Sequence, residues 1–367
     1  MTHTRRDLLA GTAGVLATSA TAGCTGQLRR IAGERSLEKG GYAAFFTLYD
    51  FARHVGGETF PVENPIPTGT MGHAYEAGPE LATEVASHEL FVYLDVEGFQ
   101  RWALDAAATI ERDYPEVELV DALDGVELLA ADADHAHESG DGHETADHDG
   151  EHETDGHGDH ETADHEADDH EADDHGETGT DETAADRSGV DPHYWTDPVR
   201  ASQSVENVRA GLEAADPDNA DVYADNAEAY RSRLEDVDAT FEEELADREH
   251  ETVVLAGHNS YRYLGDRYDF TVHSPQGVSP HAEPNQDEIS ATIDLVDREG
   301  IDVILADHFG SNDLANTIVR NSTASEVREV SPAEGTTAEW NDRGWGYVEQ
   351  LTEITLPALQ AGLGVDA

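Results

Sequence analysis

The sequence predicts an α/β protein with two Rossmann-like lobes of parallel sheet, joined by one long rigid helix and separated by a cleft. Short apolar segments alternate with amphipathic helical segments before residue 131 and again after residue 250. Strands that alternate with helices in this way form parallel sheets. Between the two series, residues 199–249 have a helical pattern throughout, apart from a turn at DPDN.

The first series begins with YAAFFTLYDFARHVGG (42–57), where an apolar strand leads into a short amphipathic helix. A strand ending in a Pro-rich loop, a helix, a strand, a helix and a strand are expected next, over residues 58–69, 79–89, 90–94, 99–114 and 125–130. The segment LFVYL is short and continuously apolar, as a strand buried on both faces must be.

The connecting segment is expected to form one long helix. Its apolar residues recur with heptad-like spacing, at Val222, Tyr223, Ala227, Tyr230, Leu234, Val237, Phe241 and Leu245. This spacing predicts a helix from about residue 217 to about residue 248. At about 1.5 Å per residue it spans roughly 45 Å, which suits a strut between two lobes.

The second series is expected to run strand, helix, strand, helix, strand, helix, strand and helix. These elements cover residues 251–257, 260–268, 270–274, 284–300, 301–306, 312–322, 327–331 and 344–364. Asn285 is a good N-cap for the second of these helices, because its side chain can accept hydrogen bonds from the first backbone N–H groups.

The chain is strongly acidic, with 21 Lys and Arg residues against 80 Asp and Glu and a formal net charge of −59. This charge argues against nucleic acids as partners, because their phosphates are repelled. The acidic residues are spread along the whole sequence, which is typical of a halophilic, haloarchaeal-like surface that stays hydrated at high salt. Hydrophobic residues still make up 38% of the chain, enough for a core.

The first residues predict export and anchoring rather than part of the fold. Arg5 and Arg6 precede a weakly apolar run too short to span a bilayer, so residues 1–23 are expected to be a twin-arginine signal peptide. Cys24, the only cysteine, ends the sequence TAGC, which predicts cleavage before it and lipid attachment to its sulfur. Residues 24–40 would be the anchor and tether, on the extracellular face of the membrane. A chance free thiol is the simpler alternative.

Residues 132–186 consist only of Asp, Glu, His, Gly, Ala, Ser and Thr. Such a segment cannot bury enough apolar surface to fold, so it is expected to be a disordered insertion. We therefore expect an N-terminal lobe over 41–200 that carries this insertion, linking helices over 201–249, and a C-terminal lobe over 250–367.

Four polar residues are expected at the carboxyl ends of strands, where ligand groups gather in open parallel sheets. His73, His258 and Asp307 each follow a predicted strand, and His193 lies where order resumes after the insertion, between prolines that restrict the backbone. Two come from each lobe, so they can meet across the cleft. Three imidazoles and one carboxylate form a complete tetrahedral set for Zn²⁺.

Each of these residues also has a simpler interpretation. His73 could be solvated in its Gly-rich loop, and His193 could merely anchor the re-entry into the lobe. His258 and Asp307 could cap the helices that follow them. His308, next to Asp307, is a competing ligand.

The segment DPHYWTDP (191–198) resembles the D-P-H-x-W-x-D-P signature of the metal-binding lipoproteins that serve zinc and manganese ABC transporters. FFTLYDFARHVGG, GHAYEAGP, HELFVYLDVEGFQRW, GHNSYRYLGDRYDF and GVSPHAEPNQDEI resemble further family segments, so the resemblance covers most of the ordered chain. It implies His73, His193 and His258 as ligands. Asp307 then stands where the family places an acidic fourth ligand, commonly glutamate. Aspartate reaches less far by one methylene, so water stays an alternative fourth ligand.

The resemblance also bears on the metal. Imidazole favours Zn²⁺ whereas Mn²⁺ prefers oxygen ligands, so histidine at position 258 favours zinc. Zinc members often carry a His- and acid-rich loop at the place of the insertion, which implies an auxiliary, weak and multivalent zinc collector. Its histidines are His135, His137, His143, His148, His152, His157, His160, His165, His170 and His175. An acidic solvating spacer is the alternative.

Together these features predict a monomeric, non-enzymatic solute-binding lipoprotein that captures extracellular Zn²⁺ and delivers it to an ABC-transporter permease in the membrane. The first alternative is the same fold binding Mn²⁺ or another divalent ion. The second is a secreted zinc hydrolase, with Glu283 as the best remaining general base. No nucleophile or base motif stands out, which disfavours the hydrolase.

Overall fold

The computed structural model describes residues 37–78, 80–131, 187, 189–280 and 282–365. The expected signal peptide, Cys24 and the histidines of the insertion lie outside these residues. The chain divides into two units, Met1–Glu38 and Lys39–Ala367, and the second is described below. Within the described part of the chain, no helix combines the length and the apolar character needed to cross a bilayer.

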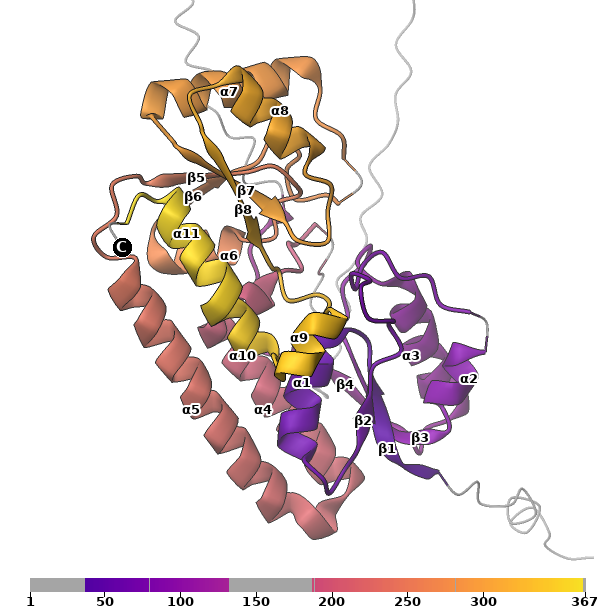
Figure 1. Ribbon diagram of the computed structural model, residues 1–367. Coiled ribbons are helices and arrows are strands. Elements are labelled where there is room, and N and C mark those ends of the chain that lie inside the picture. Colours follow the sequence, from indigo (N-terminus) through magenta and orange to yellow (C-terminus); the bar gives the residue numbers. More distant parts are fainter. Residues whose placement is uncertain (1–36, 79, 132–186, 188, 281, 366–367) are drawn as a thin grey trace, which may run out of the picture. The chain divides into compact units, whose positions relative to one another are not determined.

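The first sheet has four strands in the order β2-β1-β3-β4, in which β1 pairs in parallel with β2 and β3 with β4 (Figure 1). The strands are β1 (Glu38–Ala43), β2 (Val62–Glu63), β3 (His88–Tyr93) and β4 (Glu118–Asp121). The helices between them are α1 (Phe46–Gly56), α2 (Leu81–Val85) and α3 (Arg101–Asp113).

The strand expected over residues 125–130 is wrong, because the fourth strand lies earlier, at β4. Val120 is buried in β4, where the strand pairs with β3. Gly125 has a φ of 69° in the turn that follows, a conformation that interrupts a strand. Further along, Ala130 forms an isolated antiparallel bridge with Val190.

The second sheet has four parallel strands in the order β6-β5-β7-β8. The strands are β5 (Thr252–Leu255), β6 (Thr271–His273), β7 (Val303–Asp307) and β8 (Glu326–Val330). The helices are α6 (Arg262–Tyr268), α7 (Gln286–Glu299), α8 (Asp313–Asn321) and α9 (Ala338–Arg343). Two parallel sheets with their helices confirm the predicted α/β class.

Local signals explain why these elements form where they do. Asn285 caps α7 as expected: its side chain accepts hydrogen bonds from the backbone N–H groups of Asp287 and Glu288. The Glu288 carboxylate in turn accepts from the N–H of Asn285, which completes a capping box. Buried apolar side chains such as Val254 and Ile318 form the core between this sheet and α7 and α8.

Helices α4 (Pro198–Ala215) and α5 (Ala220–Glu244) lie between the two sheets in sequence. The N-terminal half of α5 bonds to the first lobe, where Asn226 Nδ2 donates to Val55 O at 2.9 Å. Its C-terminal half bonds to the second lobe, where Arg267 pairs with Asp238 at 2.6 Å. The long helix therefore contacts both lobes along its length.

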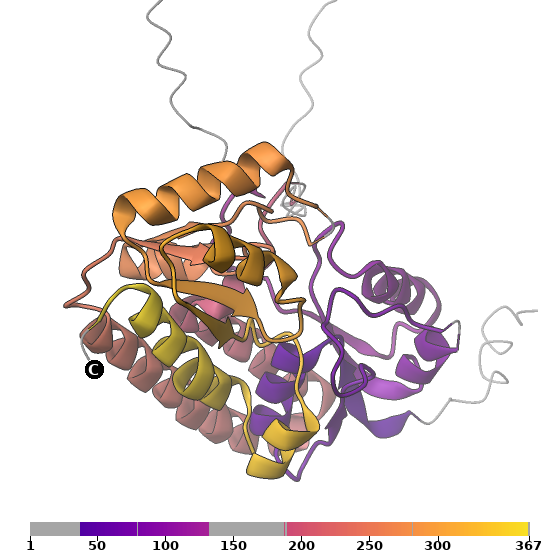
Figure 2. The same ribbon diagram turned by 45° about the horizontal axis from the view of Figure 1, so that its top comes forward.

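The final helix consists of α10 (Tyr347–Gln350), one π-helical turn (Leu351–Thr355) and α11 (Leu356–Gly362). α11 covers the face of the second sheet opposite α7 and α8 (Figures 1 and 2). At the other end, the N–H of Tyr347 donates to the buried carboxylate of Asp50 in α1, at 3.2 Å. The last helix thus ties the second sheet to the first lobe.

Candidate metal centre

His73 lies in the long loop after β2, and its side chain is 9% exposed. The amide of Gln100 holds this loop, because its Nε2 donates to Gly72 O at 2.9 Å and to Ala44 O at 3.2 Å. Gly72 packs directly on Phe45, where an added Cβ would lie 3.0 Å from that side chain. A small residue before His73 therefore lets the loop sit close to the lobe.

His193 is oriented by the first residue of its own motif. Asp191 Oδ1 accepts a hydrogen bond from the backbone N–H of His193 at 3.0 Å and lies 2.7 Å from its ring Nδ1. The other ring nitrogen, Nε2, faces Glu334 Oε1 at 3.5 Å. A carboxylate on one ring nitrogen fixes the tautomer and leaves the other free for a metal.

His258 follows β5, and the next residue anchors its loop: Asn259 N donates to Gly277 O at 2.6 Å, and Asn259 Nδ2 donates to Val272 O at 3.0 Å. His258 Nε2 is buried without a hydrogen-bond partner. Burial lowers the pKa of His258, and the neighbouring imidazoles lower it further against the opposing effect of Glu334. The ring is therefore neutral at physiological pH and can offer a lone pair.

The structure brings these three imidazoles together. The ring centres of His73 and His258 are 5.0 Å apart, and those of His193 and His258 are 5.3 Å apart. They come from the loop after β2, the segment before α4 and the loop after β5, so both lobes contribute. Their spacing is that of side chains around one small ion.

Glu334 is the acidic residue at this cluster, and sequence reasoning missed it. It lies in the loop after β8, is fully buried, and its Oε2 is 2.5 Å from His73 Nδ1. Burial alone would raise the pKa of Glu334, but the surrounding imidazoles, His73 above all, hold it well below its usual value. The rule that ligand groups follow strand ends could have found it, since SPAEG directly follows β8.

Asp307, expected as the fourth ligand, lies beside the cluster, but Glu334 is the carboxylate that contacts the imidazoles. Ligand atoms of His73, His258 and Glu334 all lie within 4.8 Å of one another, and this group includes neither His193 nor Asp307. His193 is joined to it through Glu334, whose Oε1 lies 3.5 Å from His193 Nε2. One oxygen of Asp307 accepts from the N–H of Phe309 at 2.9 Å, and burial raises the pKa of this carboxyl to about 7. His308, the competing residue, instead pairs with Glu329 at 2.6 Å.

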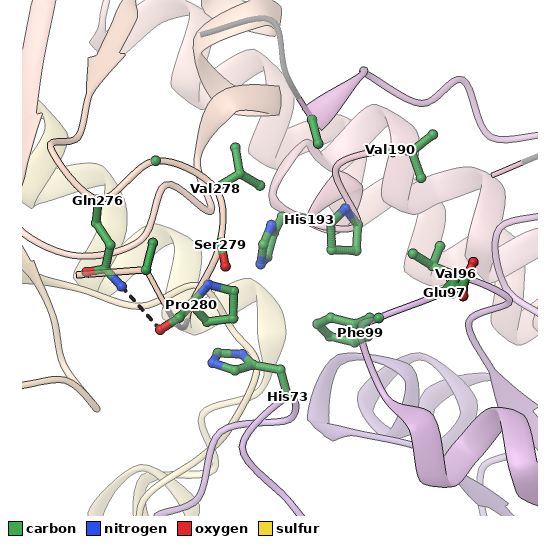
Figure 3. A pocket seen from close by; sticks show the side chains of 15 residues that line it. His73, Val96, Glu97, Phe99, Val190, His193, Gln276, Val278, Ser279 and Pro280 are labelled. Atoms are coloured by element: carbon green, nitrogen blue, oxygen red, sulfur yellow. Dashed lines mark hydrogen bonds between the residues drawn. The ribbon is translucent and has the colours of Figure 1, made fainter. Parts of the chain in front are cut away.

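A pocket of about 370 Å³ leads to the imidazoles of His73 and His193 (Figure 3). Residues 96–99 of the first lobe and residues 276–280 of the second form its walls. Ala131 and Val190 also line it. Glu283, the base considered for a hydrolase, is exposed and is not among the lining residues.

Replacing Asp191 by asparagine is expected to weaken Zn²⁺ binding about tenfold, because changing the partner of a ligating imidazole costs about 10- to 100-fold in metal affinity. Chelator competition measures the change. Asp238→Asn is the matched control: Asp191 lies 3.5 Å from Arg262 as well as beside His193, whereas Asp238 of α5 is paired with Arg267. Equal losses in the two variants would show that Asp191 has no specific role at His193.

Comparisons with known proteins identify the family. The family described as zinc-uptake complex component A, periplasmic (ZnuA), matches residues 42–355. The zinc-binding lipoprotein AdcA of Streptococcus pneumoniae is 27% identical over 321 residues, which are 86% of this chain and 54% of AdcA. The chain thus spans about half the length of the AdcA relatives it matches. The high-affinity zinc uptake system protein ZnuA of Bacillus subtilis is 24% identical over 319 residues, 87% of this chain and 86% of that protein.

Solved structures show the same fold. The Zn(II)-bound ZnuA-like domain of S. pneumoniae AdcA aligns with a TM-score of 0.64 at 23% identity, over 89% of this chain and 99% of that domain. The lipoprotein YcdH of B. subtilis aligns with a TM-score of 0.65 at 21% identity, over 89% of this chain and 100% of that one. The family match over most of its length shows that the chain belongs to the zinc-uptake complex component A family.

Proposed function

We propose that this protein captures Zn²⁺ outside the cell and delivers it to the permease of an ABC transporter. The observation that carries the proposal is the buried convergence of His73, His193, His258 and Glu334 from both lobes. One chain supplies all four groups, so a monomer is sufficient. The names of its relatives, a zinc-binding lipoprotein and a zinc uptake protein, support the same function.

The donor set favours zinc over manganese. Three imidazoles and a single carboxylate match the tetrahedral nitrogen-rich coordination of Zn²⁺, whereas Mn²⁺ is bound best by more oxygen ligands. The same set supports transport rather than hydrolysis. Four protein groups fill a tetrahedron, while a catalytic zinc keeps a position for water.

The remaining sequence predictions complete this proposal. Cys24 would carry the lipid anchor after export, and the ten histidines between His135 and His175 would collect zinc weakly. Ala131 before that insertion and Val190 after it line the pocket, which supports transfer of metal from the insertion to the primary cluster. A high local concentration would then favour transfer to the tighter site.

Chelator competition at high salt tests the proposal on three proteins: the intact chain, a variant lacking residues 135–175, and His193→Ala. We expect one tight zinc site in the first two proteins. In His193→Ala, affinity should fall more than about 100-fold, since even changes beyond the ligands cost about 10- to 100-fold. Loss of tight binding in the deletion alone would place the primary site in the His-rich segment. Equal affinities for Mn²⁺ and Zn²⁺ would favour the manganese alternative.

A further inference from the structure

The loop that carries Glu334 is held by side chains from three other segments. Trp195 Nε1 donates to Pro332 O at 2.7 Å, and Thr47 Oγ1 donates to Ala333 O at 2.5 Å. On the other side of Glu334, Gln350 Nε2 donates to Gly335 O at 3.1 Å. The three carbonyls nearest to Glu334 in the loop are therefore each bound by a specific donor.

Two of these donors lie outside the lobe that contains the loop. Thr47 is in the first turn of α1, beside the first sheet, and Trp195 follows the ligand His193. The loop after β2 adds a backbone contact, because Gly69 N donates to Thr336 O at 2.8 Å. Gly335 approaches that loop so closely that an added Cβ would lie 2.6 Å from Thr70 O. The position of Glu334 thus depends on the first lobe as well as the second.

The loop backbone also has a conformation that requires support. Ala333, directly before Glu334, has a φ of 56°, in the left-handed region that non-glycine residues avoid. Ser331 Oγ accepts from the N–H of Ala333 at 3.2 Å and donates to Gln350 Oε1 at 2.6 Å. Thr47, Ser331 and Ala333 are all fully buried, so water cannot replace a donor that is removed.

We propose that Thr47 is a positioning residue for the metal ligand Glu334, acting from the first lobe through the carbonyl of Ala333. This inference rests on the proposed zinc-binding function and extends it. The Thr47 hydroxyl has no role in the ligand cluster itself; it holds the backbone next to Glu334 in the orientation that aims the carboxylate at the imidazoles. Zinc affinity then depends on a residue that never touches the ion.

The test compares Thr47→Val, which keeps the shape and removes the donor, with Thr47→Ser, which keeps the donor. Both changes are made in the full chain and again in the Glu334→Gln background. Zinc affinity is measured by chelator competition, and ligand geometry by visible absorption of the protein with less than one equivalent of Co²⁺. Thermal unfolding of the metal-free proteins reports general loss of stability.

We expect Thr47→Val to weaken zinc binding about tenfold or more, as changes to supports of metal ligands do, and to shift the Co²⁺ spectrum towards that of Glu334→Gln. Thr47→Ser should keep affinity and spectrum close to those of the parent. In the Glu334→Gln background, Thr47→Val should cause no further loss, since the ligand it positions is already absent. Should Thr47→Val fail to fold, Thr47→Ala carries the same comparison.

Two results would overturn the inference: an unchanged affinity and spectrum in Thr47→Val, or equal losses in the two backgrounds. Both are distinct from failure of the proposed function. If the proposed function failed, the parent protein itself would lack a tight zinc site, or Glu334→Gln would leave zinc affinity unchanged.

Discussion

Replacing Glu334 by glutamine is expected to weaken Zn²⁺ binding by about two to three orders of magnitude. The change removes a fully buried carboxylate that lies 2.5 Å from His73 and faces the other two imidazoles. Changes to residues that only support metal ligands already cost about 10- to 100-fold in affinity, and loss of a carboxylate that contacts the imidazoles themselves should cost more. Chelator competition at fixed pH and salt measures this effect.

Asp307→Asn is the matched control, because Asp307 is also buried and is the last residue of a strand of the second sheet. Its loss of affinity should stay below about tenfold, because Glu334, and not Asp307, groups with the ligand atoms of His73 and His258 and pairs with His193. If instead Asp307→Asn were the more damaging change, Asp307 would be the fourth ligand and the assignment of Glu334 would be wrong.

Acidification from about pH 7.5 to about pH 5.5 is expected to lower zinc affinity by up to about 100-fold. Burial alone would lower the pKa of His73, but the Glu334 carboxylate outweighs it and raises that pKa above its usual value. Zinc binds only the deprotonated imidazole, so affinity falls by up to about tenfold per pH unit below this pKa. Isothermal titration across this range, in buffers with different ionisation enthalpies, measures both affinity and protons released.

Protonation of His73 has the opposite effect on the stability of the metal-free protein. A raised pKa means that the protonated His73–Glu334 pair stabilises the metal-free fold at low pH, and this contribution is lost as pH rises through the folded-state pKa. Acid therefore weakens zinc binding while it strengthens this pair. In Glu334→Gln the decline in affinity should begin at lower pH, because the cause of the raised pKa is gone. A pH profile that does not move in that variant would contradict the assigned role of Glu334.

Much of the fold follows from local patterns in the chain. The capping box at Asn285 forms as predicted, because it involves only residues within three positions of one another. The alternation of strands and helices gives two parallel sheets, because each apolar run is buried by the helices beside it. The strand wrongly predicted at 125–130 shows where prediction from local patterns fails. Its residues are as apolar as those of β4, but β4 is the segment whose backbone pairs with β3.

The sequence by itself determined the fold class, the strand ends where ligands gather, and the three histidines with their motif around His193. Only the tertiary structure decided which carboxylate joins them. Asp307 is the last residue of β7 and Glu334 lies shortly after β8, and no local pattern shows which of them faces the imidazoles. Glu334 turns inward because two distant side chains bind the carbonyls beside it. Thr47 binds Ala333 O across 286 residues of sequence, and Trp195 binds Pro332 O across 137. Contacts at such separations exist only once both lobes have folded against each other.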